Sequence, residues 1–200
     1  CVTTTKTGTS LSIDGQGRVR EAYQIPSPNC DARPTGEEIS LVVIHGISLP
    51  EGEFGTPYID HLFTNQIVGD EAPGFAQLKA LRVSAHLLIR RQGQLVQYVS
   101  LQQRAWHAGV STFQGRERCN DFSIGVELEG ADTIPYTELQ YQQLEWVLKL
   151  LLLHYPQITP ARIVGHCDIA PGRKSDPGVA FEWERVTQQK LSGAAGSSRP

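Results

Sequence analysis

The chain has 200 residues, 40% of them hydrophobic, which suits a single globular domain with a real core. Its net charge of −3 and sequence isoelectric point near 6.1 provide no basic footprint for nucleic acid, so we expect no nucleic-acid partner. The longest apolar run, residues 147–153, is interrupted by Lys149 and is too short to span a bilayer, so we expect no transmembrane segment.

The two ends of the chain differ in composition from the rest. Residues 1–21 are rich in Thr, Ser and Gly without periodicity, and we interpret them as an N-terminal tail. Residues 191–200 are small and polar and are predicted to form a disordered C-terminal tail. The single folded domain is therefore predicted to span residues 22–190.

The first half of this domain contains mostly strand patterns. Residues 41–45 form a continuous β-branched run, typical of a buried central strand. A short helix is expected over residues 57–65. Residues 84–90 and 95–99 flank a short connection that contains Gly93, which predicts a β-hairpin.

The second half predicts two strands and the main helix. Residues 122–129 alternate strictly, so that Glu127 and Glu129 share the polar face of a strand. Residues 136–154 form the helix, with an apolar stripe and a capping box at Thr137. A brief strand over 162–164 follows. The sum is an α/β fold in which helices flank a mixed central β-sheet.

Two of the six histidines, His45 and His166, each sit at the end of a short β run, where sites gather in open α/β sheets. Two imidazoles and one carboxylate make a catalytic zinc site and leave a coordination position open. Either Asp168 or Asp176 is a candidate for the carboxylate, and the residues alone favour neither.

Acid–base and charge-stabilising groups are also present near these segments. A carboxylate on the polar face of strand 122–129 suits proton transfer, but spacing alone does not separate Glu127 from Glu129. Lys174 lies two residues from Asp176 and could stabilise an oxyanion if Asp176 binds metal. Without a metal site, Lys174 is an ordinary solvated loop charge.

Several stretches together resemble the type 2 N-acetylmuramoyl-L-alanine amidases, a family that includes phage T7 lysozyme-type amidases and peptidoglycan recognition proteins. The resemblance runs from about residue 22 to residue 186. It is carried by Ile25–Pro28, Val43–Pro50, Gly52–Gly55, Arg82–His86, Arg104–Ser111, Gly115–Gly130 and Gly165–Gly178. It implies a single domain of the zinc amidase, T7 lysozyme-like type.

The resemblance implies a role for each matching residue. Zn²⁺ would be held by His45, His166 and Asp176, in preference to Asp168. Glu127 would be the catalytic acid and base, and Lys174 would stabilise the oxyanion. The implied substrate contacts are Trp106 under the sugar or peptide, Arg118 toward a stem-peptide carboxylate, and Arg82. One departure is Gly46, where members commonly have Asn, which removes a substrate-binding side chain but no metal ligand.

The implied activity is hydrolysis of the amide bond between (1,6-anhydro-)N-acetylmuramic acid and L-alanine in muropeptides, during peptidoglycan recycling. Two alternatives stay open: a muropeptide-recognition module that does not cut, and an envelope amidase that acts on intact peptidoglycan. The four cysteines contain no C-x-x-C pair and fit a reduced cytoplasmic protein, which we expect to be a monomer. Cys1 supports the alternative of a lipid-anchored envelope protein.

Overall fold

The computed structural model describes residues 10–186, so the predicted C-terminal tail lies outside the described residues. A mixed six-stranded sheet forms the centre, in the order β1-β5-β4-β9-β3-β10. Its strands are β1 (Tyr23–Gln24), β3 (Leu41–Ile47), β4 (Leu87–Ile89), β5 (Leu95–Gln97), β9 (Ser123–Glu129) and β10 (Ile163–Gly165). Only β4 and β5 pair antiparallel, as the predicted hairpin; every other neighbouring pair is parallel.

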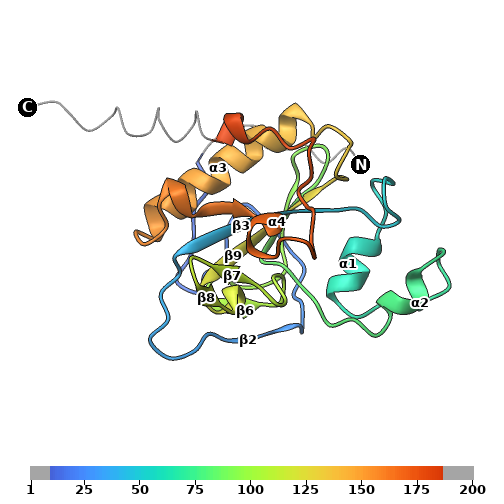
Figure 1. The fold of residues 1–200 in the computed structure, drawn as a ribbon, viewed down its shortest axis with the longest axis horizontal. Coiled ribbons are helices and arrows are strands. Elements are labelled where there is room, and N and C mark those ends of the chain that lie inside the picture. The colour runs from blue at the N-terminus through green and yellow to red at the C-terminus, as the bar shows by residue number, and fades with distance from the viewer. Residues whose placement is uncertain (1–9, 187–200) are drawn as a thin grey trace, which may run out of the picture.

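The remaining elements surround this sheet. Two small antiparallel sheets pair β2 (Cys30–Ala32) with β6 (Gln103–Ala105) and β7 (Thr112–Phe113) with β8 (Arg116–Glu117). The helices are α1 (Tyr58–Phe63), α2 (Phe75–Leu78), α3 (Glu138–His154) and α4 (His166–Ile169), with 3-10 turns at Cys119–Asp121 and Pro160–Arg162. The α/β fold with helices flanking a mixed sheet is confirmed (Figure 1).

Helix α3 covers one face of the sheet, and Figure 1 shows it running along the sheet, away from α1 and α2. Its capping box forms as predicted, because the Thr137 side chain accepts from the Gln140 N–H and the Gln140 side chain accepts from the Thr137 N–H. Leu144, Val147 and Leu151 then pack on alternate residues of β3, β4 and β9. On the opposite face, Leu88 of β4 and Val96 of β5 pack with α1 and α2, whereas Leu41 and Val43 of β3 pack against the segments around Phe122 and α4. Both faces of the central strands are therefore buried, as in parallel sheets generally.

The predicted N-terminal tail needs a correction over the part that the structure describes. Ile13 and Val19 form an antiparallel bridge, and Val19 is completely buried in the core beneath α3. The Val19 N–H donates to the Gln97 side chain at 2.8 Å. Residues 10–21 thus pack against the domain through Val19, with Leu11 and Ile13 beside it, and through hydrogen bonds from residues 97–102 to the carbonyls of residues 15–17, which leaves no periodic pattern to recognise.

Candidate functional site

The site begins with two side chains on neighbouring parallel strands. His45 on β3 and Glu127 on β9 are register partners, and both point to the face opposite α3. His45 Nδ1 lies 3.8 Å from Glu127 Oε1, and both side chains are almost fully buried. His45 lies inside β3 rather than just after it, because parallel pairing with β9 continues to Ile47.

The other predicted ligands come from the adjacent edge of the sheet. β10 pairs parallel with β3, and His166 follows it directly as the first residue of α4. Asp176 lies in the segment after α4, whose backbone is tied back by the bond from the Cys167 N–H to the Asp176 carbonyl, 3.0 Å long. Strand pairing and this short return bring side chains far apart in sequence to one point.

His45, His166 and Asp176 form a cluster that could hold a metal ion. The two Nδ1 atoms are 3.0 Å apart, and each lies 3.2 Å from an Asp176 carboxylate oxygen. Ligands about 2.0–2.1 Å from a tetrahedral zinc ion would be separated by about 3.3 Å, which matches these spacings. The donor set of two imidazoles and one carboxylate, with a fourth position free, fits a catalytic zinc ion.

Asp168, the other carboxylate considered, is used structurally. Its Oδ2 accepts from the Gly165 N–H at 2.7 Å, at the beginning of α4. Asp168 is therefore a helix-capping residue and lies outside the metal-type cluster that His45, His166 and Asp176 form.

Burial and hydrogen bonding shift the pKa values of three groups at the site. Burial lowers the pKa of His45 to about 4, which keeps the imidazole neutral, as a metal ligand must be. Burial also raises the pKa of Glu127 well above its usual range, and the Asp176 carboxylate adds to this shift. Burial would act the same way on Asp176, but hydrogen bonds from His166 and His45 outweigh it and hold its pKa well below its usual range. The two carboxyl groups are thus driven apart in acidity, as expected of an acid–base group beside a ligand.

The structure separates Glu127 from Glu129, which spacing alone did not. The Glu129 carboxylate accepts from the backbone N–H groups of Gly55 and Arg91, at 2.9 and 3.2 Å. Glu127 Oε2 is buried without a hydrogen-bond partner beside the metal-type cluster. An orphaned carboxyl oxygen of this kind is available for a reacting group.

A cavity of about 480 Å³ opens over the cluster. Its lining includes His45, His166, Asp176 and Glu127, together with Trp106 and Lys174 from the sequence prediction. The Lys174 charge lowers the pKa of Glu127 as a minor contribution after burial and Asp176, and it lowers the pKa of His45 after burial, Asp176 and His166, so its ammonium acts electrostatically on the site.

The two predicted arginine contacts do not line this cavity. The Arg118 side chain is 74% exposed, and its Nε lies 3.6 Å from Asp121 Oδ2. Arg82 is exposed and donates to the backbone carbonyls of Lys79 and Leu81. Their roles in substrate binding stay predictions.

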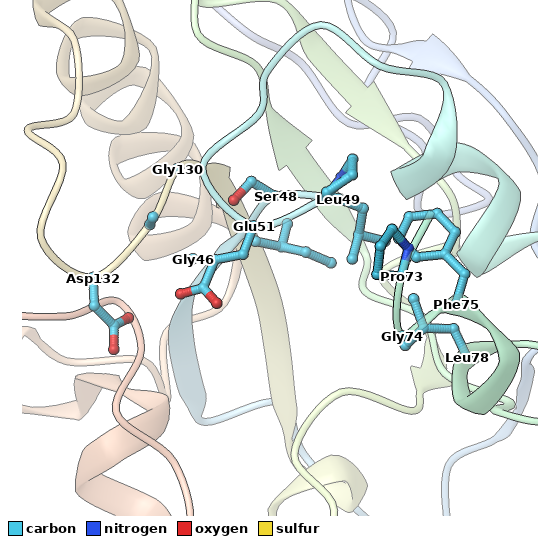
Figure 2. A pocket seen from close by; sticks show the side chains of 13 residues that line it. Gly46, Ser48, Leu49, Glu51, Pro73, Gly74, Phe75, Leu78, Gly130 and Asp132 are labelled. Carbon is cyan, nitrogen blue, oxygen red and sulfur yellow. The ribbon is translucent and has the colours of Figure 1, made fainter. Parts of the chain in front are cut away.

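A second hollow, of about 350 Å³, adjoins the cavity and shares Gly46, Ile47, Leu49 and Leu78 with it. In Figure 2 the Glu51 and Asp132 carboxylates lie toward one side of this hollow, with Pro73, Phe75 and Leu78 toward the other. The cavity and the second hollow therefore form one continuous depression, and Gly46 lines both parts.

The structure explains why residue 46 is a glycine. A Cβ at this position would overlap the hydroxyl of Tyr136, which donates to the Pro177 carbonyl at 2.7 Å. Tyr136 thus fills the space beside Gly46, the residue after His45, and its hydroxyl holds Pro177, the residue after Asp176. No periodic pattern in the sequence links positions 46, 136 and 177.

Sequence reasoning also missed the groups that surround the ligands. The His107 side chain is buried and contacts His45, with 2.9 Å between Nδ1 and the His45 Nε2. Arg173 lines the cavity and donates to the Ala108 carbonyl at 2.6 Å. The sequence feature that could have pointed to His107 is the Trp-His-Ala-Gly stretch at 106–109, which begins with the predicted substrate contact Trp106.

The fold and the buried cluster define the chain as a mixed α/β protein with a His/His/Asp group that could hold a metal ion. A family model described as N-acetylmuramoyl-L-alanine amidase matches residues 35–179, and the chain belongs to this family of amidases. It is 59% identical over 170 residues to the 1,6-anhydro-N-acetylmuramyl-L-alanine amidase AmpD of Escherichia coli K12, covering 85% of this chain and 92% of that protein.

Solved structures agree with this assignment. A crystal structure of an AmpD derivative superposes with a TM-score of 0.86 at 56% identity, covering 89% of this chain and 98% of that one. AmiD of Escherichia coli, in complex with the substrate anhydro-N-acetylmuramic acid-L-Ala-D-gamma-Glu-L-Lys, gives a TM-score of 0.56 at 29% identity, with 90% and 65% coverage. Among residues 10–186, no helix is both long and apolar enough to cross a membrane.

Proposed function

We propose that this chain is a zinc-dependent amidase that cleaves the amide bond between 1,6-anhydro-N-acetylmuramic acid and L-alanine in muropeptides released for recycling. The observation that carries the proposal is the His45, His166 and Asp176 cluster with the unpartnered Glu127 carboxyl beside it. The similarity to AmpD supports the choice of substrate.

Each group at the site has a separate proposed role in hydrolysis. A bound zinc ion would supply a Lewis acid and lower the pKa of water to about 7. Glu127 takes a proton from the attacking water, and its high pKa lets it keep that proton until the leaving amine needs it. The Lys174 ammonium, at the cavity wall, stabilises the negative charge that develops on the carbonyl oxygen.

Substrate binding is proposed to use Trp106, whose indole lines the cavity, with Arg118 and Arg82 outside it. The Trp106 ring nitrogen donates to Asp31 at 3.2 Å, which fixes the ring. An aromatic face held in this way suits stacking against a sugar ring or a peptide plane.

Two other functions compete with this one. A recognition module that binds muropeptides without cutting them would be expected to lack a metal ligand, whereas all three are present in one cluster. An envelope amidase anchored through Cys1 would act on intact peptidoglycan; Cys1 lies outside the described residues. Cys30, Cys119 and Cys167 are free thiols, which supports a reducing compartment such as the cytoplasm. The monomeric state stays a prediction.

Turnover of the two substrate classes tests the proposal. Purified protein loaded with one zinc per chain is given anhydromuramyl tripeptide or intact sacculi, and release of free peptide is measured. We expect rapid release from the anhydromuramyl peptide and little from sacculi. The reverse preference would support the envelope enzyme, and tight binding of either ligand without release would support the recognition module.

A further inference from the structure

One short segment contacts both ligand imidazoles through their Nε2 atoms, opposite the Nδ1 atoms that meet in the cluster. His45 Nε2 lies 2.9 Å from His107 Nδ1, and His166 Nε2 lies 3.1 Å from the Ala108 carbonyl oxygen. The Nδ1 atoms of both ligands are the ones that meet in the metal-type cluster. Residues 107 and 108 therefore determine how both rings are turned.

This segment is itself fixed by hydrogen bonds. Asn120 Oδ1 accepts from the backbone N–H groups of both His107 and Ala108, at 3.1 and 2.8 Å. Arg173 donates to the same Ala108 carbonyl that faces His166. Gly125 provides the room for the buried imidazole, because a Cβ there would lie 2.6 Å from His107 Cγ. Such support holds the His107 ring in one place.

The direction of the hydrogen bonds follows from the ligand atom. If His45 binds a metal through Nδ1, its proton must be on Nε2, and His107 Nδ1 must then accept. His107 then carries its own proton on Nε2, which faces Ser123 Oγ at 3.0 Å. The opposite direction, with Ser123 donating, would place protons on Nδ1 of both histidines, and the His45 proton would point into the cluster.

We propose that His107 is a positioning residue that, with Ser123, holds His45 in the tautomer that can bind the metal. The inference rests on the proposed function, because it concerns the same zinc site. A ligand histidine usually donates to a carboxylate, a backbone carbonyl or water. His166 follows that pattern through Ala108, whereas the partner of His45 is the buried imidazole of His107. This choice orients His45 without adding a second negative charge to a site that already contains Asp176.

Three substitutions at position 107 separate orientation from packing. Asn places its Oδ1 where Nδ1 lies and keeps the acceptor, whereas Leu fills the space without one and Gln carries its amide farther out. Zinc affinity is measured by competition with a chromophoric chelator, and folding by thermal unfolding. We expect His107→Leu and His107→Gln to weaken zinc binding about 10–100-fold, and His107→Asn to restore most of it. Equal losses in Leu and Asn variants that remain folded, or wild-type affinity in the Leu variant, would overturn the proposal.

The serine gives a test at a distance from the metal. Ser123→Ala removes the group that faces His107 Nε2, and we expect zinc affinity to fall about 2–10-fold, the worth of one neutral hydrogen bond. Ser27→Ala is the matched control, since Ser27 is also buried and hydrogen-bonded but contacts Phe63 and Asn29 rather than His107. Unchanged affinity in Ser123→Ala would refute the part assigned to Ser123.

The tautomers can also be observed directly. In the ¹⁵N spectrum of zinc-loaded protein, His45 and His107 should each show a protonated Nε2 and an unprotonated Nδ1. A proton on His107 Nδ1 would contradict the proposal. Failure of the proposed function is distinguishable, because it would appear as wild-type protein that binds no zinc or that binds zinc without cleaving anhydromuramyl peptide.

Discussion

His45 and Glu127 are register partners on adjacent parallel strands, and 3.8 Å separates the imidazole Nδ1 from the carboxyl Oε1. Parallel pairing therefore sets the distance between the first proposed metal ligand and the proposed acid–base group. A register shift of one residue in either strand would turn one of them to the opposite face of the sheet.

The first prediction concerns the metal. His166→Ala removes one of the three clustered ligands, so the variant should lose the single zinc ion per chain and all measurable turnover. Metal content by mass spectrometry and peptide release are measured on the same preparation. Full activity of wild-type protein after exhaustive chelation would refute the assignment. His154→Ala, at the exposed end of α3, is the control for loss of a histidine.

The second prediction separates the two strand carboxylates. Glu127→Gln should retain zinc and fold but lose about 10²–10⁴-fold in kcat, because general acid–base catalysis is removed. Glu129→Gln should reduce stability more than turnover, since that carboxylate holds the Gly55 and Arg91 N–H groups. If the two variants exchanged these phenotypes, the assignment of Glu127 would be wrong.

The third prediction concerns Arg118. Its exposed guanidinium has one long contact to Asp121, so a bidentate bond to a substrate carboxylate is compatible with its position. Arg118→Lys keeps the charge but loses the planar fork, and it should lower kcat/KM for longer stem peptides by about 10–150-fold relative to the L-alanine-only substrate. An equal loss on both substrates would instead assign Arg118 to loop structure.

The sequence predicted the sheet, the α3 helix and its capping box because these depend on local periodicity. The ligand set came from a family resemblance, and the structure supports its geometry because parallel pairing gathers His45 and His166 at one edge. The contact between His45 and His107 and the contact between Gly46 and Tyr136 were not predictable in this way. They join positions separated by 62 and 90 residues, and each depends on how one side chain fills the space beside another.

The fourth prediction tests the Gly46–Tyr136 contact. Gly46→Ala places a methyl group against the Tyr136 hydroxyl and should destabilise the fold by about 1–3 kcal/mol, the usual cost of overpacking. Tyr136→Phe removes the hydroxyl and its bond to Pro177, which should cost about 1 kcal/mol. In denaturant unfolding, the double variant should be more stable than the sum of the two losses predicts. Simple additivity would show that the methyl group is accommodated elsewhere.

The fifth prediction concerns acid stability. Burial, assisted by the Arg33 charge, lowers the pKa of His86 to about 3, compared with about 6.5 in an unfolded chain. Between these values the unfolded chain binds a proton that the folded chain does not, so falling pH should reduce the free energy of unfolding by up to about 1.4 kcal/mol per pH unit. The contribution of His86 to stability is fully retained above about pH 6.5.

The matched variant is His86→Asn, which keeps an acceptor for the Gly125 N–H but does not titrate. Its free energy of unfolding should fall less steeply than that of wild type between pH 6 and pH 4. Both proteins are measured with the same chelator present, so that metal release does not differ between them. Identical slopes would show that His86 is not responsible.

The ligands of the cluster are far apart along the chain: 121 residues separate His45 from His166, and Asp176 comes later still. During synthesis, a growing chain that has not yet reached β10 offers only one of the three ligands. A zinc ion held by all three side chains would therefore require β10 to be paired with β3, so that zinc binding would report the docking of β10.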